Sequence, residues 1–196
     1  MAPETCADGA DRAGSSSTLW AWRHPRPRGV AGRCIGRTDV PVDRRRAKRL
    51  ARRIQRTARQ HGLPRVVCSS PLRRCADVAR WLRRWGWVWQ RDAALLELDF
   101  GRWDGLPWSA IARDEVDAWC ADFARCAPGG GEALQAMLAR AAAWQPPASA
   151  AAGAVVVVGH AGWMLARQWA HSGHATPPQA EHWPQAPACG ALLRLR

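Results

Sequence analysis

Short apolar runs alternate with amphipathic stretches along most of this 196-residue chain. Three runs have the length and composition of buried strands, at residues 18–22 (TLWAW), 65–69 (RVVCS) and 153–158 (GAVVVV). Weaker patterns predict two more strands, at residues 87–90 and 189–195. Helical periodicity fills the intervals, at residues 43–60, 71–86, 108–127 and 132–144 and after residue 162. This alternation predicts a three-layer, doubly wound α/β fold, in which helices cover both faces of a mainly parallel sheet.

Capping residues mark the starts of two of these helices. Asp43 is a candidate N-cap for the first, and Gly62 with Pro64 marks its end. The apolar residues of this helix recur every three or four positions, at Ala47, Leu50, Ala51, Ile54 and Ala58. Arginines fill most other positions, and we interpret them as the solvated side of an amphipathic helix. Ser70 as cap and Pro71 at the first helical position predict the start of the second helix.

The chain length suits one α/β domain. Residues 1–17 are small and polar, so we expect a disordered tail followed by a single domain at residues 18–196. The tail lacks the apolar core of a secretory signal, and polar residues and glycines interrupt the most apolar stretch, residues 148–166. The seven cysteines form no C-x-x-C pair, which favours reduced thiols. We therefore expect a cytoplasmic protein that does not enter a membrane.

The charge is strongly positive, because 29 arginine and lysine residues against 16 acidic residues give a net charge of +13. Such a balance occurs in proteins that bind nucleic acid, anionic membranes or acidic substrates. Only one of the basic residues is lysine, however, and alanine, proline, glycine and tryptophan are also abundant. A drift in overall composition explains these features together, and we favour it over a selected binding surface. No specific nucleic-acid partner is expected.

Cationic and imidazole groups follow three of the predicted strands. Arg23 and His24 come directly after the first strand, and His160 follows the strand at 153–158. Ser69 and Ser70, with arginines after them, follow the strand at 65–69. Ligands bind beyond the carboxyl ends of the strands in sheets of this type. The pattern therefore predicts one site that combines these groups.

Five motifs resemble those of the histidine phosphatase (phosphoglycerate mutase-like) superfamily, in the order that family has them. They are WRHPRP at 22–27, CSSPLRRC at 68–75, LLELDFGRWDG at 95–105, PGGGEAL at 128–134 and VVVVGHAG at 155–162. Within the superfamily, GRCIGRTDVP at 32–41, the ELDFG wording and the H-A-G variant are most similar to alpha-ribazole phosphatases. The resemblance implies a phosphatase that acts on a small phosphorylated substrate, alpha-ribazole phosphate in cobalamin nucleotide-loop assembly.

The resemblance also implies the roles of individual residues. His24 is the nucleophile that becomes phosphorylated, a role that needs a neutral imidazole with one free nitrogen. Arg23 and Arg74 bind the phosphoryl oxygens, with Arg73 as the adjacent alternative, because a planar guanidinium suits bidentate contact with phosphate. His160 contacts the same oxygens. No metal or other cofactor is implied, since cationic side chains supply the electrostatic stabilisation.

One carboxyl group is implied as general acid and then general base. Glu97 matches that position, and Asp99 is the second choice. Pro25 stands where the family usually has glycine, so a backbone donor is lost there. Arg37 is a candidate for substrate contact, and an ion pair with Asp39 is an equal alternative.

Several other interpretations stay open at this point. Trp103 and Trp108 lie near the acid-bearing motif, so either is a candidate to stack on a flat substrate base. His171 and His174 have a spacing that metal ligands use, but no third ligand completes the set and a solvated helix end is favoured. The alternative functions are a mutase or broad sugar and nucleotide phosphatase with the same fold and, more distantly, a basic nucleic-acid-binding module. A monomer or homodimer is expected.

Overall fold

A computed structural model describes residues 18–148, 153–174 and 178–196 of the chain. The expected disordered tail at residues 1–17 and Cys6 lie outside the described residues. No helix within the described ranges is long and apolar enough to cross a membrane.

The centre of the molecule is a five-stranded sheet with the order β3-β2-β4-β1-β5. Its strands are β1 (Thr18–Arg23), β2 (Val66–Ser69), β3 (Val88–Arg91), β4 (Ala154–Gly159) and β5 (Leu192–Leu195). The first four run parallel, and β5 pairs antiparallel with β1 at one edge. The mainly parallel sheet expected from the sequence is therefore confirmed.

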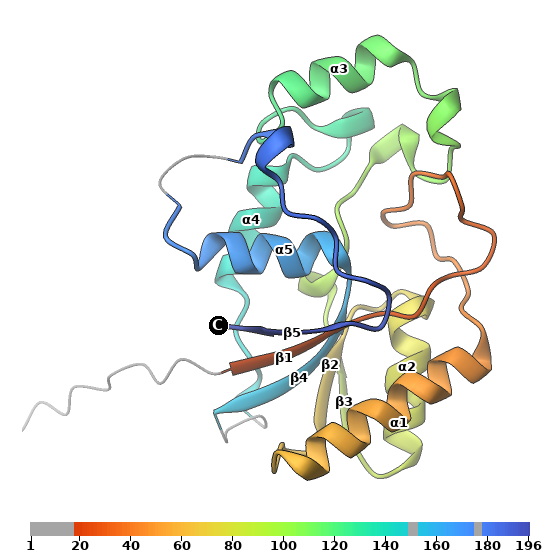
Figure 1. The fold of residues 1–196 in the computed structure, drawn as a ribbon, viewed down its shortest axis with the longest axis vertical. Coiled ribbons are helices and arrows are strands. Elements are labelled where there is room, and N and C mark those ends of the chain that lie inside the picture. The colour runs from red at the N-terminus through yellow and green to blue at the C-terminus, as the bar shows by residue number, and fades with distance from the viewer. Residues whose placement is uncertain (1–17, 149–152, 175–177) are drawn as a thin grey trace, which may run out of the picture.

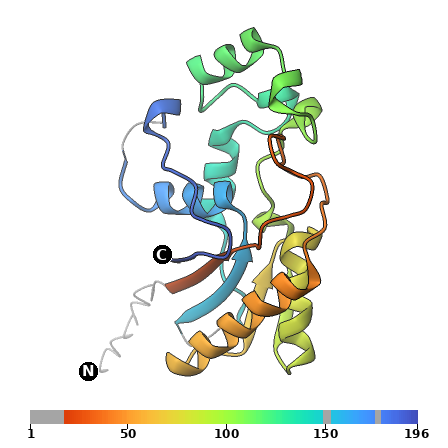
Figure 2. The same cartoon turned by 45° about the vertical axis from the view of Figure 1, so that its right-hand side comes forward.

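Helices cover both faces of this sheet, so the molecule has three layers (Figure 1). The α-helices are α1 (Arg44–Gln60), α2 (Arg73–Arg84), α3 (Arg113–Ala121), α4 (Leu134–Ala143) and α5 (Ala161–Ala170). The 3-10 turns are η1 (Ala93–Leu95), η2 (Gly101–Trp103), η3 (Trp108–Ala110), η4 (Pro128–Gly130) and η6 (Ala180–His182). Helices α1 and α2 pack on one face and α4 and α5 on the other, whereas α3 lies beyond one end of the sheet (Figures 1 and 2).

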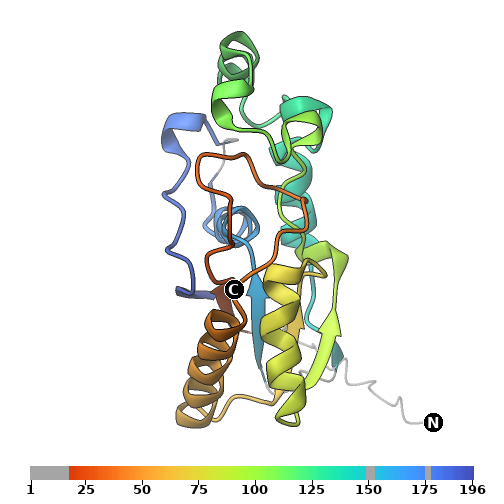
Figure 3. The ribbon, with the colours of Figure 1, turned by 90° about the vertical axis from the view of Figure 1, so that its right-hand side faces the viewer.

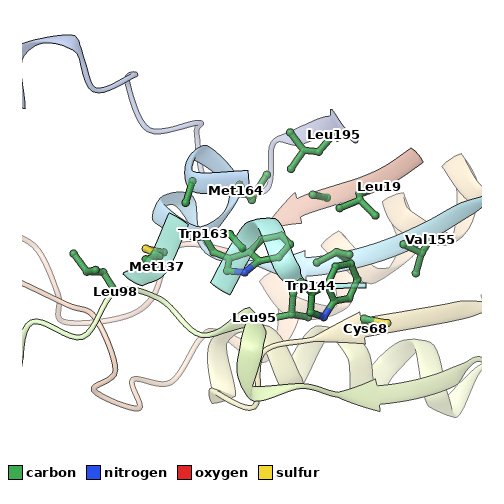
Figure 4. Close-up of a cluster of buried hydrophobic side chains, with 14 of the residues drawn as sticks. Leu19, Cys68, Leu95, Leu98, Met137, Trp144, Val155, Trp163, Met164 and Leu195 are labelled. Atoms are coloured by element: carbon green, nitrogen blue, oxygen red, sulfur yellow. The ribbon is translucent and has the colours of Figure 1, made fainter. Parts of the chain in front are cut away.

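Alternate residues of each central strand serve opposite faces, because strand side chains have a period of two. In β1, Trp20 and Trp22 pack toward α1 and α2, while Leu19 and Ala21 pack toward α4 and α5. Figure 4 shows the apolar cluster on the face covered by α4 and α5, to which both Leu19 and Trp163 belong. Burial on both faces explains why the strands read as nearly continuous apolar runs.

The two predicted helix starts have different outcomes. Asp43 caps α1 as expected, since its carboxylate accepts hydrogen bonds from the backbone amides of the second and third residues of the helix. Helix α2 begins at Arg73, so the prediction of a start at Pro71 with Ser70 as cap is wrong. Leu72 precedes the helix and offers no side-chain cap. The Arg73 amide instead donates to the Asp39 carboxylate at 2.6 Å, a partner 34 residues away in sequence.

The predicted helix at 108–127 is shorter in the structure, where a 3-10 turn precedes α3. On either side of α3, two glycine-rich loops lie against each other. A Cβ at Gly101 would meet the Gly129 carbonyl oxygen at 2.2 Å, and one at Gly129 would meet that of Phe100 at 2.2 Å. A Cβ at Gly131 would meet the Asp99 carbonyl oxygen at the same distance. Glycine is therefore required on both loops by their close approach.

Candidate active site

The carboxyl ends of β1 and β4 place two histidines side by side. His24 follows the last residue of β1, and its amide donates to the carbonyl oxygen of Gly159, the last residue of β4, at 3.0 Å. His160 comes next in β4's connection to α5, and the two imidazole centroids are 5.2 Å apart. Figure 3 shows the arrowheads of β3 and β4 pointing to the loops at this edge. The two rings thus meet at the edge of the sheet predicted for the site.

The His24 ring is buried with its tautomer set by one hydrogen bond. Its Nδ1 lies 2.8 Å from the carbonyl oxygen of Pro25, and because a carbonyl only accepts, Nδ1 carries the hydrogen. The Nε2 lone pair is therefore free. Burial, followed by the positive charge of Arg74, lowers the pKa of His24 to about 3. His24 is consequently neutral at physiological pH, the form a nitrogen nucleophile needs.

Arg74 is almost completely buried at the start of α2. Its Nε donates to His160 Nδ1 at 3.2 Å, and its Nη1 and Nη2 donate to the carbonyl oxygens of Thr38 and Gly36 at 2.8 and 2.5 Å. Arg73 is exposed and does not line the cavity that holds His24. The structure therefore brings Arg74, and not the alternative Arg73, to the site.

His160 lies deeper in the protein than His24, which lines the cavity. It is fully buried and does not line the cavity, since its Nδ1 faces Arg74 and its Nε2 lies 3.5 Å from Cys75 Sγ. Burial and then the charge of Arg74 hold the pKa of His160 well below its usual value. The structure brings His160 to the site as expected, but the phosphoryl contact implied by the resemblance stays a prediction.

The Glu97 carboxylate lines the cavity and packs against Gly162, which has no side chain. Its Oε2 accepts from the Gly162 amide at 3.1 Å, and its Oε1 accepts from the Leu98 amide at 3.1 Å. A Cβ at Gly162 would stand 2.3 Å from Glu97 Oε1. Glycine at this position is therefore what allows the carboxylate to pack against the start of α5.

The candidate acid Asp99 and the candidate substrate contact Arg37 bind one another instead of lining the cavity. Arg37 forms ion pairs with Asp99 and Glu132, both at 3.2 Å. The alternative pair of Arg37 with Asp39 is wrong, because Arg37 pairs with those two acids and not with Asp39 in the described residues. Placement therefore favours Glu97 over Asp99 as the carboxyl group of the site.

Asp104 supports the loop that holds Arg74, a role the sequence did not reveal. Its carboxylate accepts from the backbone amides of Gly36, Arg37 and Thr38 at 3.0, 2.5 and 2.9 Å, and from the Thr38 hydroxyl at 2.7 Å. The carbonyl oxygens of Gly36 and Thr38 are the acceptors of Arg74. Asp104 thus positions Arg74 through this short loop.

A cavity of about 540 Å³ opens in front of His24. Its polar end is formed by Arg23, His24, Arg74 and Glu97. Arg23 Nη1 donates to the Pro187 carbonyl oxygen at 2.6 Å, whereas its buried Nε has no partner among the described residues. Arg23 is thus held at the cavity by a backbone carbonyl, and a guanidinium there is suited to binding a phosphoryl oxygen.

The rest of the cavity wall is predominantly apolar and rich in aromatic rings. Its apolar side chains are Pro27, Val30, Ile35, Leu98, Phe100, Trp108, Trp119, Phe123, Leu134, Met137, Trp183 and Ala186. Of the two tryptophans that the sequence singled out, Trp108 lines the cavity and is 40% exposed. Trp103 is buried elsewhere, where its Nε1 donates to Glu115.

Sequence reasoning missed Arg33 and Trp183, which also line the cavity. Arg33 lies in the loop after β1 and Trp183 in the segment before β5, so only the folded chain brings them to His24. The motif GRCIGRTDVP contained Arg33, but nothing in its spacing separated a cavity residue from an exposed one.

The possible metal ligands His171 and His174 have other contacts. His171 Nδ1 lies 3.0 Å from the Arg167 carbonyl oxygen, and the His174 ring stacks on Trp169 with centroids 3.9 Å apart. Within the described ranges, no group of three or more histidine, cysteine, aspartate or glutamate residues is placed to hold a metal ion.

The site defines a class of protein. A neutral imidazole with a free nitrogen, flanked by arginines and a carboxylate at the carboxyl edge of a parallel sheet, is suited to phosphoryl transfer. The chain belongs to the histidine phosphatase superfamily (branch 1), whose family model matches residues 19–195. The protein is therefore a phosphatase, and the superfamily expected from the five motifs is confirmed.

Solved structures of similar proteins agree with this assignment. A mycobacterial glucosyl-3-phosphoglycerate phosphatase in complex with VO3 is 30% identical, with a TM-score of 0.60 over 76% of this chain and 79% of that chain. A protein described as a mycobacterial hydrolase is 28% identical, with a TM-score of 0.60 over 76% of each chain. A protein from Thermus thermophilus is 26% identical, with a TM-score of 0.57 over 82% of this chain and 89% of that chain. No curated protein sequence matches the chain.

Proposed function

We propose that the protein hydrolyses a phosphomonoester through a phosphohistidine intermediate on Nε2 of His24. The observation that carries this proposal is the contact of His24 Nδ1 with the Pro25 carbonyl oxygen, which leaves Nε2 unprotonated and without a hydrogen-bond partner among the described residues. Pro25 thus contributes an acceptor at the position where it cannot contribute an amide donor.

In the first step the Nε2 lone pair attacks phosphorus, and the bond between phosphorus and the ester oxygen breaks. Glu97, acting as the general acid, gives a proton to the departing alcohol. Arg23 and Arg74 stabilise the charge on the equatorial oxygens, because both guanidinium groups line the polar end of the cavity. The phosphorylated ring carries one positive charge, the phosphoryl group two negative charges and the Glu97 carboxylate one, so the total equals the two negative charges of the substrate.

In the second step a water molecule attacks phosphorus, and the bond to Nε2 breaks. The Glu97 carboxylate now accepts the proton of that water, which restores the acid for the next cycle. Phosphate leaves, and His24 returns to its neutral form. The residues of the chain perform every transfer in this sequence.

We propose that the substrate is alpha-ribazole phosphate and that the enzyme acts in cobalamin nucleotide-loop assembly. Its phosphate would lie at the polar end of the cavity, and its flat apolar base suits the aromatic wall. Trp108 has an exposed ring on that wall, so it is the candidate to stack on the base.

A phosphoglycerate-type ester is the second candidate. Arg33 lines the cavity in addition to the two arginines at the polar end, and a carboxylate on the substrate would pair with it. A similar structure is a glucosyl-3-phosphoglycerate phosphatase. The two candidates therefore depend on different residues of the same wall.

Phosphate release in excess chelator tests the reaction. Alpha-ribazole phosphate, 3-phosphoglycerate and a sugar monophosphate would be compared, with His24→Gln as the nucleophile variant. His61→Gln is the matched control, because His61 is exposed and outside the cavity. We expect release to fall by more than about 10³-fold in His24→Gln only. Equal release by His24→Gln and the parent would contradict the phosphohistidine mechanism.

Two further variants separate the substrates. Trp108→Ala should raise KM for alpha-ribazole phosphate by about tenfold through lost stacking, and should leave KM for 3-phosphoglycerate nearly unchanged. Arg33→Ala should have the opposite pattern. An unchanged KM for alpha-ribazole phosphate in Trp108→Ala would remove the stacking role.

A further inference from the structure

The positive charge of the chain is concentrated on one face. Helices α1 and α2 carry 14 of the 29 basic residues and a single acidic residue, Asp77, so their formal net charge equals that of the whole chain, +13. Helices α3, α4 and α5 together carry three basic and three acidic residues. Compositional drift would spread arginine over all helices. The distribution therefore favours a selected surface over the compositional drift that the sequence alone favoured.

A groove of about 780 Å³ runs along this face between the start of α1, the length of α2 and the edge strand β3. Six arginines line it: Arg44, Arg73, Arg80, Arg83, Arg84 and Arg91. The groove shares no lining residue with the catalytic cavity. It is thus a separate feature of the surface.

Acidic side chains neutralise little of this charge. Asp77 pairs with Arg80, and the other five arginines of the groove form no ion pair with any carboxylate in the described residues. Like charges gathered in a concave surface focus a positive potential and attract anions. The groove therefore has the electrostatics of an anion-binding site.

Two tryptophans on the groove wall hold several of the cations in place. The guanidinium carbons of Arg44 and Arg84 lie 5.4 and 5.1 Å from the Trp81 ring centroid, and that of Arg91 lies 4.9 Å from the Trp89 ring centroid. A guanidinium over an aromatic ring keeps its in-plane N–H groups available for phosphate oxygens. These arginines are consequently ordered before any ligand binds.

We propose that this groove binds single-stranded nucleic acid without sequence preference. A basic groove that follows the phosphate backbone is the common design of such sites, and the guanidinium planes over the two rings can themselves stack on bases. A concave groove fits a flexible chain better than it fits the flat surface of a bilayer. The chain would therefore combine a phosphatase site with a nucleic-acid site on a different face.

Fluorescence anisotropy of a labelled oligothymidylate of about 20 nucleotides, longer than the site size of one binding module, tests the proposal. The groove variant is Arg83→Ala with Arg91→Ala. The control variant is Arg113→Ala with Arg125→Ala, which removes the same charge from exposed residues outside the groove. We expect about tenfold weaker binding for the groove variant alone. Its slope of log K against log salt should be shallower by about 1.4, since each phosphate contact contributes roughly 0.7 for single strands.

Three outcomes would overturn the proposal. Equal weakening by both variants would mean that net charge alone attracts the oligonucleotide. No binding by the parent protein at low salt would show that the groove does not bind single-stranded nucleic acid. Tighter binding to phosphatidylserine vesicles than to the oligonucleotide, lost in the groove variant, would assign the face to a membrane surface. Phosphatase activity of each variant, measured in parallel, should equal that of the parent because neither pair touches the cavity.

Discussion

The position of the Glu97 carboxylate depends on the absence of a side chain at residue 162. Because a Cβ there would stand 2.3 Å from Glu97 Oε1, Gly162→Ala should push the carboxylate away from the cavity. We expect kcat to fall by about 10- to 100-fold, within the range that a general acid contributes. Stability should not fall with it, since alanine has a better helix propensity than glycine by about 1 kcal/mol.

Gly159→Ala is the matched control for this change. The added Cβ would lie 3.8 and 3.9 Å from its nearest neighbours, which is ordinary van der Waals contact. Steady-state kinetics and thermal melts of both variants check the prediction. A fully active Gly162→Ala enzyme would show that the Glu97 position is not needed.

Asp104 is a second residue on which the site depends, because it holds the loop at residues 36–38. Asp104→Ala removes the acceptor of four hydrogen bonds, so we expect the free energy of unfolding to fall by about 2–4 kcal/mol. Inhibition by vanadate should weaken by about tenfold, because Arg74 loses the two fixed carbonyl oxygens that orient it. Thr38→Val, which removes one of the four bonds, should have a much smaller effect. Loss of stability with unchanged vanadate inhibition would limit Asp104 to a structural role.

The sequence identified the residues at strand ends better than the residues that support them. His24 and Glu97 were found because they fall in recognisable motifs, and both line the cavity. The partners of Arg37 and Asp39 were not found, because each binds a group at least 34 residues away in sequence, and no local pattern encodes such a contact. Spacing reveals which residues share an element, whereas long-range pairing depends on how the loops fold.

The two glycine-rich loops on either side of α3 interlock at the scale of elements. Gly131→Ala would place a Cβ 2.2 Å from the Asp99 carbonyl oxygen, so the loops must separate. We expect a loss of about 3 kcal/mol or more in the free energy of unfolding, comparable to overpacking a core. Gly130→Ala is the control next to it, because its nearest neighbour, Arg102 Nη1, would be 3.9 Å away. That variant has only the strain of a positive φ, about 1 kcal/mol. Equal losses in urea denaturation would contradict the interlocking.

Elements whose burial pattern is local were predicted well. Strands β1, β2 and β4 were visible as apolar runs because helices cover both of their faces. The start of α2 was misplaced because its cap, Asp39, comes from another segment. The predicted helix at 108–127 was too long because Ile111 and Ala112 adopt extended backbone and Asp122 ends α3, which leaves a 3-10 turn and a short helix.

At the scale of the whole molecule, burial of the two histidines should make stability depend on pH. The pKa of His24 is lowered from 6.5 to about 3, and that of His160 is also lowered, so the unfolded chain binds more protons than the folded one between these values. The contribution of the neutral histidines to the free energy of unfolding is therefore complete above pH 6.5 and is lost as the pH falls toward 3. For His24 the full loss is on the order of 5 kcal/mol, since one pKa unit corresponds to about 1.4 kcal/mol.

The two carboxylates whose pKa values are lowered act at the acidic end of this range and below it. The pKa values of Asp43 and Glu115 are lowered by hydrogen bonds, so their contributions fade only below about pH 4. Urea denaturation between about pH 7 and pH 5 therefore stays above the range of those two carboxylates, and comparison with His24→Gln identifies the share of His24. In His24→Gln the slope of the unfolding free energy against pH should be shallower by up to about 1.4 kcal/mol per pH unit, the value for one proton. An identical slope in the parent and in His24→Gln would mean that folding does not lower the pKa of His24, so burial would not be what keeps the ring neutral.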